Sequence, residues 1–103
     1  TKYRAIIVDD SDIDRLIVQS FVKKQPFLEL QGAYSNPLEA LDTLNKTPAD
    51  VLFLDVDMPF LKGTELRAQL LDVPACIFIT SYADYALEAF DLAALDFVMK
   101  PLT

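Results

Sequence analysis

The sequence predicts an α/β fold in which a doubly wound, five-stranded parallel sheet lies between helices. Three observations lead to this prediction: short apolar runs that suit buried strands, segments of helical periodicity between them, and a length that fits one domain. The chain has 103 residues, of which 52% are hydrophobic, and a chain of this size folds around one core. We therefore expect a single domain over residues 1–103.

The expected strands are short runs of β-branched and aromatic residues. Four of them lack polar alternation, which is typical of strands covered on both faces of a parallel sheet. They are residues 5–8, 51–54, 76–79 and 97–99. A fifth run, residues 28–34, alternates between apolar and polar residues, as an edge strand does.

The segments between these strands have the periodicity of helices. Apolar residues recur at intervals of three and four, which places them on one helical face. They are Ile13, Leu16, Ile17 and Phe21 in the first segment, Leu38, Leu41 and Leu44 in the second, and Leu66 with Leu70 in the third.

Helix start signals support these segments. Ser11 with Asp14 forms a capping-box pattern, Asn36-Pro37 matches an N-cap followed by proline, and Asp84 can cap a helix that begins near residue 85. Strands that alternate with helices give a mostly parallel sheet, and hence a flavodoxin-like fold. Because the pattern stops at residue 103, we expect the last helix of this architecture to be missing or truncated.

The composition excludes several classes of function. Sixteen acidic and nine basic residues give a net charge of −7, so DNA binding by this domain alone is disfavoured. Cys76 lies in an apolar run and is expected to be a buried, inert thiol. No leader sequence and no apolar stretch of roughly 20 residues is present. We therefore expect a cytoplasmic domain without membrane contact.

Polar side chains follow four of the expected strands at their carboxyl ends. The first run ends in Asp9-Asp10, the second in Asp55, the third in Thr80-Ser81 and the fourth in Lys100-Pro101. Ligands of open α/β sheets bind at this rim. The sequence therefore places three carboxylates, two hydroxyls and an ammonium group at one edge of the sheet.

Each of these residues also has an ordinary structural interpretation. Asp9 and Asp10 could be turn or N-cap residues, but with Asp55 they form a group of carboxylates that repel one another unless a cation neutralises them. Oxygen ligands in this number suit Mg²⁺. Asp55 itself could be a cap, or a nucleophile that forms an acyl phosphate.

The remaining rim residues have two interpretations as well. Lys100 could be a solvated surface lysine, or it could pair with Asp55 or a phosphate oxygen; Pro101 suggests a constrained, cis peptide that aims it. Thr80 could bond to nearby backbone, or it could donate to a phosphoryl oxygen. Phe97 fits a core position.

These motifs together resemble the receiver domains of bacterial response regulators, the CheY-like superfamily. The matching stretches run from residue 8 to 11, from 54 to 59 with Gly63 beyond, from 79 to 81 and from 97 to 101. They occur in the order that the family shows, which makes the combination specific although each short motif is weak. Two departures are Ser81, where many receivers have alanine, and Phe60, where a small residue is common.

The resemblance implies a function and a role for each rim residue. A partner histidine kinase would phosphorylate Asp55, with Mg²⁺ held by Asp10 and Asp55, by Asp9 through water, and by the backbone carbonyl of Asp57. The phosphoryl group would contact Thr80 and Lys100. Thr80 and Phe97 would form the switch pair, which couples phosphorylation to the fourth helix and last strand.

The segment from residue 80 to 97 resembles receivers of the LytR/AlgR type. Those regulators usually carry a C-terminal LytTR DNA-binding domain, so this domain would control transcription through an effector domain absent from these residues. Tyr85, Ala89 and Phe90 have helical spacing after the switch threonine. One face of this helix must cover the sheet, so some of these residues should pack in the core. We expect the helix to form the interface of a weak, phosphorylation-enhanced homodimer.

Two other functions compete with a receiver. Leu54-Asp55-Val56-Asp57 also resembles the nucleophile motif of haloacid-dehalogenase-like phosphatases, but those enzymes place the nucleophile on the first strand and further acids after the lysine. We therefore expect a domain that is not an enzyme. A degenerate receiver or flavodoxin-like cofactor binder would keep the fold only. With two glycines, the chain lacks a glycine-rich phosphate loop.

Overall fold

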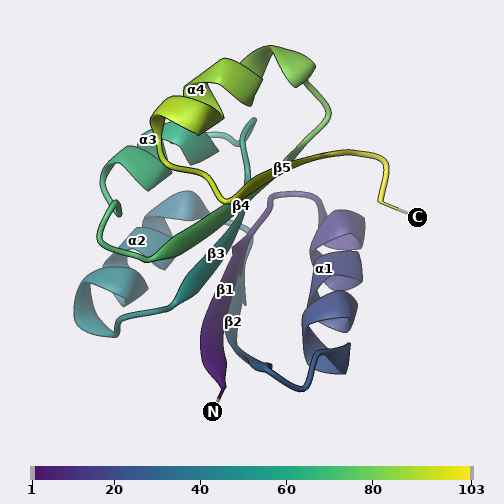
Figure 1. Cartoon of the computed structure of the whole chain (residues 1–103), viewed down its shortest axis with the longest axis vertical. Coiled ribbons are helices and arrows are strands. Elements are labelled where there is room, and N and C mark those ends of the chain that lie inside the picture. The colour runs from purple at the N-terminus through teal and green to yellow at the C-terminus, as the bar shows by residue number, and fades with distance from the viewer. Residues whose placement is uncertain (1, 103) are drawn as a thin grey trace.

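The computed structural model describes residues 2–102 and confirms the α/β prediction. Strands and helices alternate along the chain (Figure 1). The elements are β1 (Tyr3–Val8), α1 (Asp12–Lys24), β2 (Leu28–Tyr34), α2 (Pro37–Lys46), β3 (Val51–Asp55), α3 (Gly63–Ala68), β4 (Ala75–Thr80), the 3₁₀ turn η1 (Ala83–Tyr85), α4 (Ala86–Asp91) and β5 (Asp96–Met99).

The five strands form one sheet in the order β2-β1-β3-β4-β5, and every neighbouring pair is parallel. The alternating run at residues 28–34 forms the edge strand β2, as its pattern predicted. The unbroken apolar run at residues 51–54 lies in β3 at the centre of the sheet, where all five residues of the strand are buried. The parallel arrangement brings the carboxyl ends of all strands to one rim.

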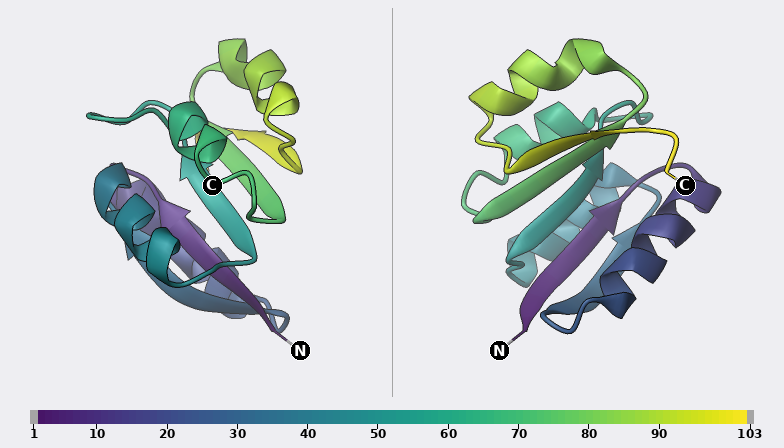
Figure 2. Two further views of the ribbon diagram at one scale, coloured as in Figure 1. Left: turned by 90° about the vertical axis from the view of Figure 1, so that its left-hand side faces the viewer. Right: turned by 45° about the vertical axis from the view of Figure 1, so that its right-hand side comes forward.

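Helices cover the two faces of the sheet unequally, as both views of Figure 2 show. Ala40 of α2, Leu66 of α3 and Ala89 of α4 are buried with Ile6 and Leu54 in the larger core cluster. The smaller cluster lies on the opposite face, where only α1 contributes helical residues. They are Val18 and Val22, which pack with Ala5, Ile7 and Phe53 of the sheet.

The predicted buried face of the first helix is wrong. Ile13, Leu16 and Phe21 are more than half exposed, and Ile17 is 38% exposed. The buried positions of α1 are Val18 and Val22 instead. Because α1 covers only part of its sheet face, Ile17 and Phe21 border an open groove of about 480 Å³ rather than the core. Lining residues of this groove include Ile17, Phe21, Ile79, Val98 and Leu102.

The other helix predictions had mixed outcomes. Asn36 caps α2 as predicted, because its side chain accepts a hydrogen bond from the Leu38 N–H at 2.9 Å. In the predicted faces, Leu44, Leu66 and Leu70 are buried, whereas Leu38 is 49% exposed. Asp84 is not a cap: it lies inside η1, and neither η1 nor α4 has a side-chain cap.

Cys76 is buried in the core, as its apolar neighbours predicted. Burial raises the pKa of its thiol to about 12, although the charge of Arg67 opposes this shift. The reactive thiolate is therefore scarce at neutral pH. Within the described residues, no helix combines the length and the apolarity needed to cross a membrane.

Arg67 is a buried cation that the sequence did not reveal. Its side chain is 1% exposed and donates only to backbone carbonyls. The Nη1 atom lies 2.8 Å from the Val73 oxygen and 3.1 Å from the Leu70 oxygen, and Nε lies 3.0 Å from the Leu92 oxygen. Arg67 thus ties the end of α3 to the loop before β4 and to the turn after α4.

We predict that Arg67→Met lowers the free energy of unfolding by about 3 kcal/mol, because it leaves several buried carbonyls without a donor. Arg67→Lys should restore only part of this stability, since an ammonium lacks the guanidinium's planar array of donors. Urea unfolding followed by circular dichroism measures both effects. Arg4→Met is the control, because the Arg4 side chain is 40% exposed and its partly screened ion pair with Asp50 should matter less. Equal losses in Arg4→Met and Arg67→Met would contradict the proposed tie.

Candidate functional site

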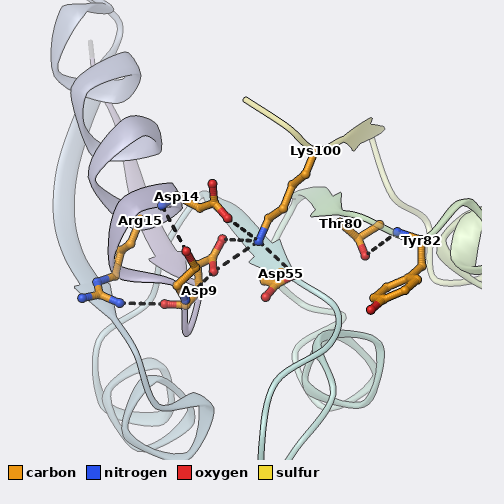
Figure 3. A network of polar contacts seen from close by, with 8 residues as sticks. Asp9, Asp14, Arg15, Asp55, Thr80, Tyr82 and Lys100 are labelled. Carbon is orange, nitrogen blue, oxygen red and sulfur yellow. Dashed lines mark hydrogen bonds and ion pairs between the residues drawn. The ribbon is translucent and has the colours of Figure 1, made fainter. Parts of the chain in front are cut away.

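The fold brings the predicted polar residues together at the carboxyl rim of the sheet, and Figure 3 shows Asp9, Asp55, Thr80 and Lys100 among them. Asp9 and Asp10 follow β1, Asp55 is the last residue of β3, and Thr80 is the last residue of β4. Lys100 follows β5, and its peptide bond to Pro101 is cis, as the sequence suggested. Residues that lie as many as 91 positions apart in the chain are therefore in direct contact.

Three carboxylates form the centre of the site. Asp9, Asp10 and Asp55 each offer an oxygen, and these three oxygens lie within 4.8 Å of one another. Asp9 is 2% exposed and Asp55 is 5% exposed, whereas Asp10 faces solvent. The cluster therefore combines two buried charges with one that remains open to water.

Burial and mutual repulsion raise the pKa values of the two buried carboxyl groups, those of Asp55 and Asp9. Burial, followed by the charge of Asp9, raises the pKa of Asp55 from its ordinary value to about 7, and the Asp10 carboxylate acts in the same direction. Burial also raises the pKa of Asp9, although the hydrogen bond from the Ser11 N–H and the charge of Lys100 oppose this shift. The negative charge of the cluster is therefore only partly balanced by the protein itself.

Lys100 supplies the cation at the centre of the site. Its Nζ lies 3.2 Å from Oδ2 of Asp9, 2.9 Å from Oδ2 of Asp14 and 3.6 Å from Oδ1 of Asp55. Burial of the ammonium lowers its pKa, but its short contact with the accepting Asp14 carboxylate and the charges of Asp55 and Asp9 outweigh this effect and raise the pKa. Lys100 is thus a charged group within the cluster rather than a solvated surface lysine.

Asp14 is a site residue that the sequence analysis missed. The capping-box pattern assigned its side chain to the start of α1, but only half of that pattern forms. Ser11 Oγ accepts a hydrogen bond from the Asp14 N–H at 3.3 Å, whereas the Ser11 N–H donates to Oδ1 of Asp9 at 2.9 Å. The Asp14 carboxylate turns to Lys100 instead, a contact between residues too distant in the chain for local patterns to reveal.

Arg15 holds the loop between β1 and α1. Its Nη1 donates to the backbone oxygen of Asp9 at 2.8 Å, and its Nη2 donates to Oδ1 of Asp12 at 2.6 Å. The side chain of Asp12 is 83% exposed. The loop that presents the acidic pair is therefore fixed by bonds from both Ser11 and Arg15.

Thr80 is fully buried next to the acidic cluster, on the strand beside β3. Its Oγ1 accepts a hydrogen bond from the Tyr82 N–H at 3.2 Å, the local backbone contact that was one of its two interpretations. A hydroxyl that accepts one bond retains its own proton for donation. Thr80 can therefore still donate to a group bound at Asp55.

The predicted switch and interface residues differ in exposure. Phe97 is half-buried against the larger core cluster and pairs with Phe78 across the sheet. Tyr85 is half-buried and Phe90 is 79% exposed. Ala89 is 1% exposed and packs in the larger core cluster, as expected for some residues of this helix. A place for Ala89 in an interface stays a prediction.

The loop after β3 wraps closely around the Asp55 backbone. The Gly63 N–H donates to the Val56 oxygen at 2.8 Å. A Cβ atom at Gly63 would lie 1.9 Å from the Asp55 backbone oxygen, so only glycine fits there. Asp57 lies in this loop and its side chain is exposed. Phe60 is 80% exposed and adopts a φ of 75°, a left-handed conformation that is unfavourable for a bulky residue.

The donor set of the cluster fits a divalent cation. Its ligands are carboxylate oxygens only, as Mg²⁺ prefers, and the exposed side at Asp10 leaves room for the waters that Mg²⁺ retains. A cation would also relieve the repulsion by Asp9 that, together with the larger effect of burial, raises the pKa of Asp55. The residues present therefore fit Mg²⁺, with Asp9, Asp10 and Asp55 as the side chains that would hold it.

Comparisons with known proteins lead to one family. A family model for the response regulator receiver domain matches residues 5–103. An uncharacterized response regulatory protein of Yersinia pestis is 37% identical over 101 residues, and the transcriptional regulatory protein BtsR of Escherichia coli is 35% identical over 101 residues. Each match covers 96% of this chain and 42% of the relative. The chain thus spans about two fifths of the length of these relatives.

Solved structures agree with this match. The response regulator domain of CheB from Thermotoga maritima is 29% identical with a TM-score of 0.87, over 98% of this chain and 80% of that one. The response regulatory domain of protein mrkE from Klebsiella pneumoniae is 29% identical with a TM-score of 0.91, over 97% of this chain and 84% of that one.

We predict that Gly63→Ala lowers the free energy of unfolding by at least about 2 kcal/mol, because the added methyl group overlaps backbone that cannot move freely. It should also weaken Mg²⁺ binding, since the displaced backbone carries Asp55. Gly32→Ala is the matched control, because the atoms its Cβ would approach, at 2.9 Å, belong to the movable Tyr34 side chain. Thermal unfolding and isothermal titration with Mg²⁺ measure the two effects. Indistinguishable behaviour of the two variants would contradict the proposed contact.

Proposed function

This chain belongs to the response regulator receiver family of two-component systems, and from that premise we propose that it accepts a phosphoryl group on Asp55 with the help of Mg²⁺. The observation that carries the proposal is the position of Asp55. It is a buried carboxylate at the end of the central strand, between two further carboxylates and the Lys100 ammonium. An ionised carboxylate in this position is a nucleophile whose surroundings are built to hold additional negative charge once a cation is bound.

The proposed reaction is the transfer of a phosphoryl group from a phosphohistidine of a sensor kinase. An Asp55 carboxylate oxygen attacks phosphorus while the bond from phosphorus to the imidazole nitrogen breaks. The electron pair of that bond returns to the imidazole, which then takes up a proton, and an acyl phosphate remains on Asp55. The 103 residues contain no histidine, so the donor must be a different segment or protein.

Each rim residue has a proposed part in this transfer. Bound Mg²⁺ would neutralise charge on the phosphoryl oxygens and on the carboxylates. Asp10 and Asp55 would hold it directly, Asp9 through water, and Asp57 through its backbone carbonyl. Lys100 would contact a phosphoryl oxygen, since its Nζ is already 3.6 Å from Asp55. The domain would stop at the phosphorylated state and so would not be a turnover enzyme.

We further propose that Thr80 and Phe97 transmit phosphorylation to the surface. The Thr80 hydroxyl would donate to a phosphoryl oxygen, and Phe97 would rotate inward behind it. Phe97 is half-buried on the strand next to Thr80, so it can respond to a small shift there. Phosphorylation shifts the population towards the inward positions of Thr80 and Phe97 if the phosphoryl group binds that state more tightly than the resting state.

For the output, we propose a LytR/AlgR-type regulator that controls transcription from the cytoplasm through a C-terminal DNA-binding domain. The pattern of residues 80–97 supports this type. So does the similarity to BtsR, which is described as a transcriptional regulatory protein. The receiver itself carries a net charge of −7 and would not bind DNA.

We predict that beryllium fluoride, which imitates a phosphoryl group on a carboxylate, binds the domain only when Mg²⁺ is present. Amide signals around Asp9, Asp55, Thr80 and Lys100 should shift in an NMR titration. Asp55→Asn should show no saturable binding, because its amide cannot replace the carboxylate. Equal shifts in wild type and Asp55→Asn would place the site elsewhere. Sustained hydrolysis of a phosphomonoester with Mg²⁺ would instead favour a phosphatase.

We also predict a weak homodimer that the phosphate mimic strengthens through α4 and β5. Leu87 and Phe90 are 74% and 79% exposed and lie three residues apart, so α4 presents both on one side. Phe90→Ala should weaken the dimer in sedimentation experiments, because it removes exposed apolar area from the interface. Phe27→Ala is the control, since this exposed residue precedes β2 at the opposite end of the sheet. Identical oligomeric states with and without the mimic would contradict the proposal.

A further inference from the structure

The closest partner of the Lys100 ammonium is not the proposed phosphoacceptor. Its Nζ lies 2.9 Å from Asp14, whereas it lies 3.6 Å from Asp55, which is beyond hydrogen-bond distance. A charge-assisted N–H···O bond typically measures about 2.7–2.9 Å. Of these two ion pairs, only the one to Asp14 is therefore as short as a charge-assisted contact should be. Figure 3 shows the Asp14 carboxylate extended from α1 towards Lys100.

Asp14 is also held away from solvent. Its side chain is 22% exposed and that of Lys100 is 12% exposed, so the pair is only partly screened by water. Asp12, two residues earlier in the same helical turn, is 83% exposed and pairs with Arg15 instead. Of the two acidic residues in the first turn of α1, Asp14 is thus the one whose side chain contacts the site.

We propose that Asp14 is a positioning residue that holds Lys100 in a resting position and competes with a phosphoryl group on Asp55 for its ammonium. The inference rests on the proposed function. Asp14 does not touch the incoming group. It acts through Lys100, which must exchange one partner for another when the site becomes occupied.

The competition follows from the number and direction of the contacts. A lysine has three donor hydrogens, and in the resting site they serve Asp14 and Asp9, with Asp55 nearby. A phosphoryl oxygen on Asp55 offers a stronger acceptor, but Lys100 reaches it fully only by loosening its bond to Asp14. The Asp14 bond therefore subtracts from the affinity of the site for a phosphoryl group. Removal of the Asp14 charge should make that affinity higher.

The test compares beryllium fluoride affinity at saturating Mg²⁺ in wild type, Asp14→Asn and Asp14→Ala. A partly exposed ion pair changes an equilibrium by up to about fivefold. We expect Asp14→Asn to bind the mimic about fivefold more tightly, and Asp14→Ala at least as tightly, because it also removes the acceptor. Calorimetric titration measures the affinities, and thermal unfolding verifies that each variant is folded.

Asp12→Asn is the matched control, since it removes the same charge from the same turn without a contact to Lys100. It should change the affinity by less than about twofold, because fully exposed charges are strongly screened. A second control repeats Asp14→Asn in a Lys100→Met background. If Asp14 acts through Lys100, Asp14→Asn should no longer raise the affinity for beryllium fluoride in this background. If Asp14 merely repels the bound anion, Asp14→Asn should raise the affinity there as well.

Three outcomes would overturn the inference. Weaker or unchanged binding in folded Asp14→Asn would show that Asp14 does not compete. An equal gain in Asp12→Asn, or a gain that survives in the Lys100→Met background, would show a general charge effect. Failure of wild type itself to bind the mimic would overturn the proposed function together with this inference, and so differs from failure of the inference alone.

Discussion

The crowding of carboxylates around one ammonium group is the constraint on which the rest of this structure depends. Asp9 and Asp55 are almost fully buried, and isolated buried charges are costly unless they are paired. Lys100 meets part of this need by contacting Asp9 and Asp14 and by approaching Asp55. One ammonium cannot balance these acids and Asp10 as well. The resting site therefore keeps uncompensated negative charge, which favours the binding of a further cation.

The surrounding backbone is arranged so that these charges cannot move apart. Asp55 ends a strand that is buried along its whole length, and Gly63 lies so close to its carbonyl that no side chain fits between them. On the other side, Ser11 and Arg15 fix Asp9 through its carboxylate and its backbone oxygen. Rigid placement of this kind keeps the electrostatic cost of the resting site high. A cation bound among the three carboxylates would recover part of that cost.

The sequence predicted the sheet and its rim well because both depend on short-range patterns. Unbroken apolar runs identified the strands, and the first polar residue after each run identified the site. The buried faces of the helices were harder to predict than the strands. Apolar residues cover a wide part of the surface of α1. Periodicity alone could not show that Val18 and Val22 face the sheet while Ile13 stays exposed. Asp14 was missed because Lys100 lies far away in the chain. Arg67 was missed because its partners are backbone carbonyls, which no residue pattern reveals, and one of them, that of Leu92, is distant as well.

Two sets of contacts lead from the site towards Tyr82 and Tyr85, which bears on how a local change could reach the surface. Thr80 bonds to the Tyr82 N–H, and the rings of Tyr82 and Tyr85 meet edge to face at 6.4 Å. The Tyr85 hydroxyl accepts a bond from Lys62 Nζ at 3.2 Å, and Lys62 immediately precedes the glycine that touches the Asp55 backbone. A displacement of Thr80 or of the Asp55 backbone therefore acts on the same pair of tyrosines from two directions. Neither η1 nor α4 has a side-chain cap, whereas β4 is mostly buried. The segment that carries this pair is therefore held less firmly than the strand before it.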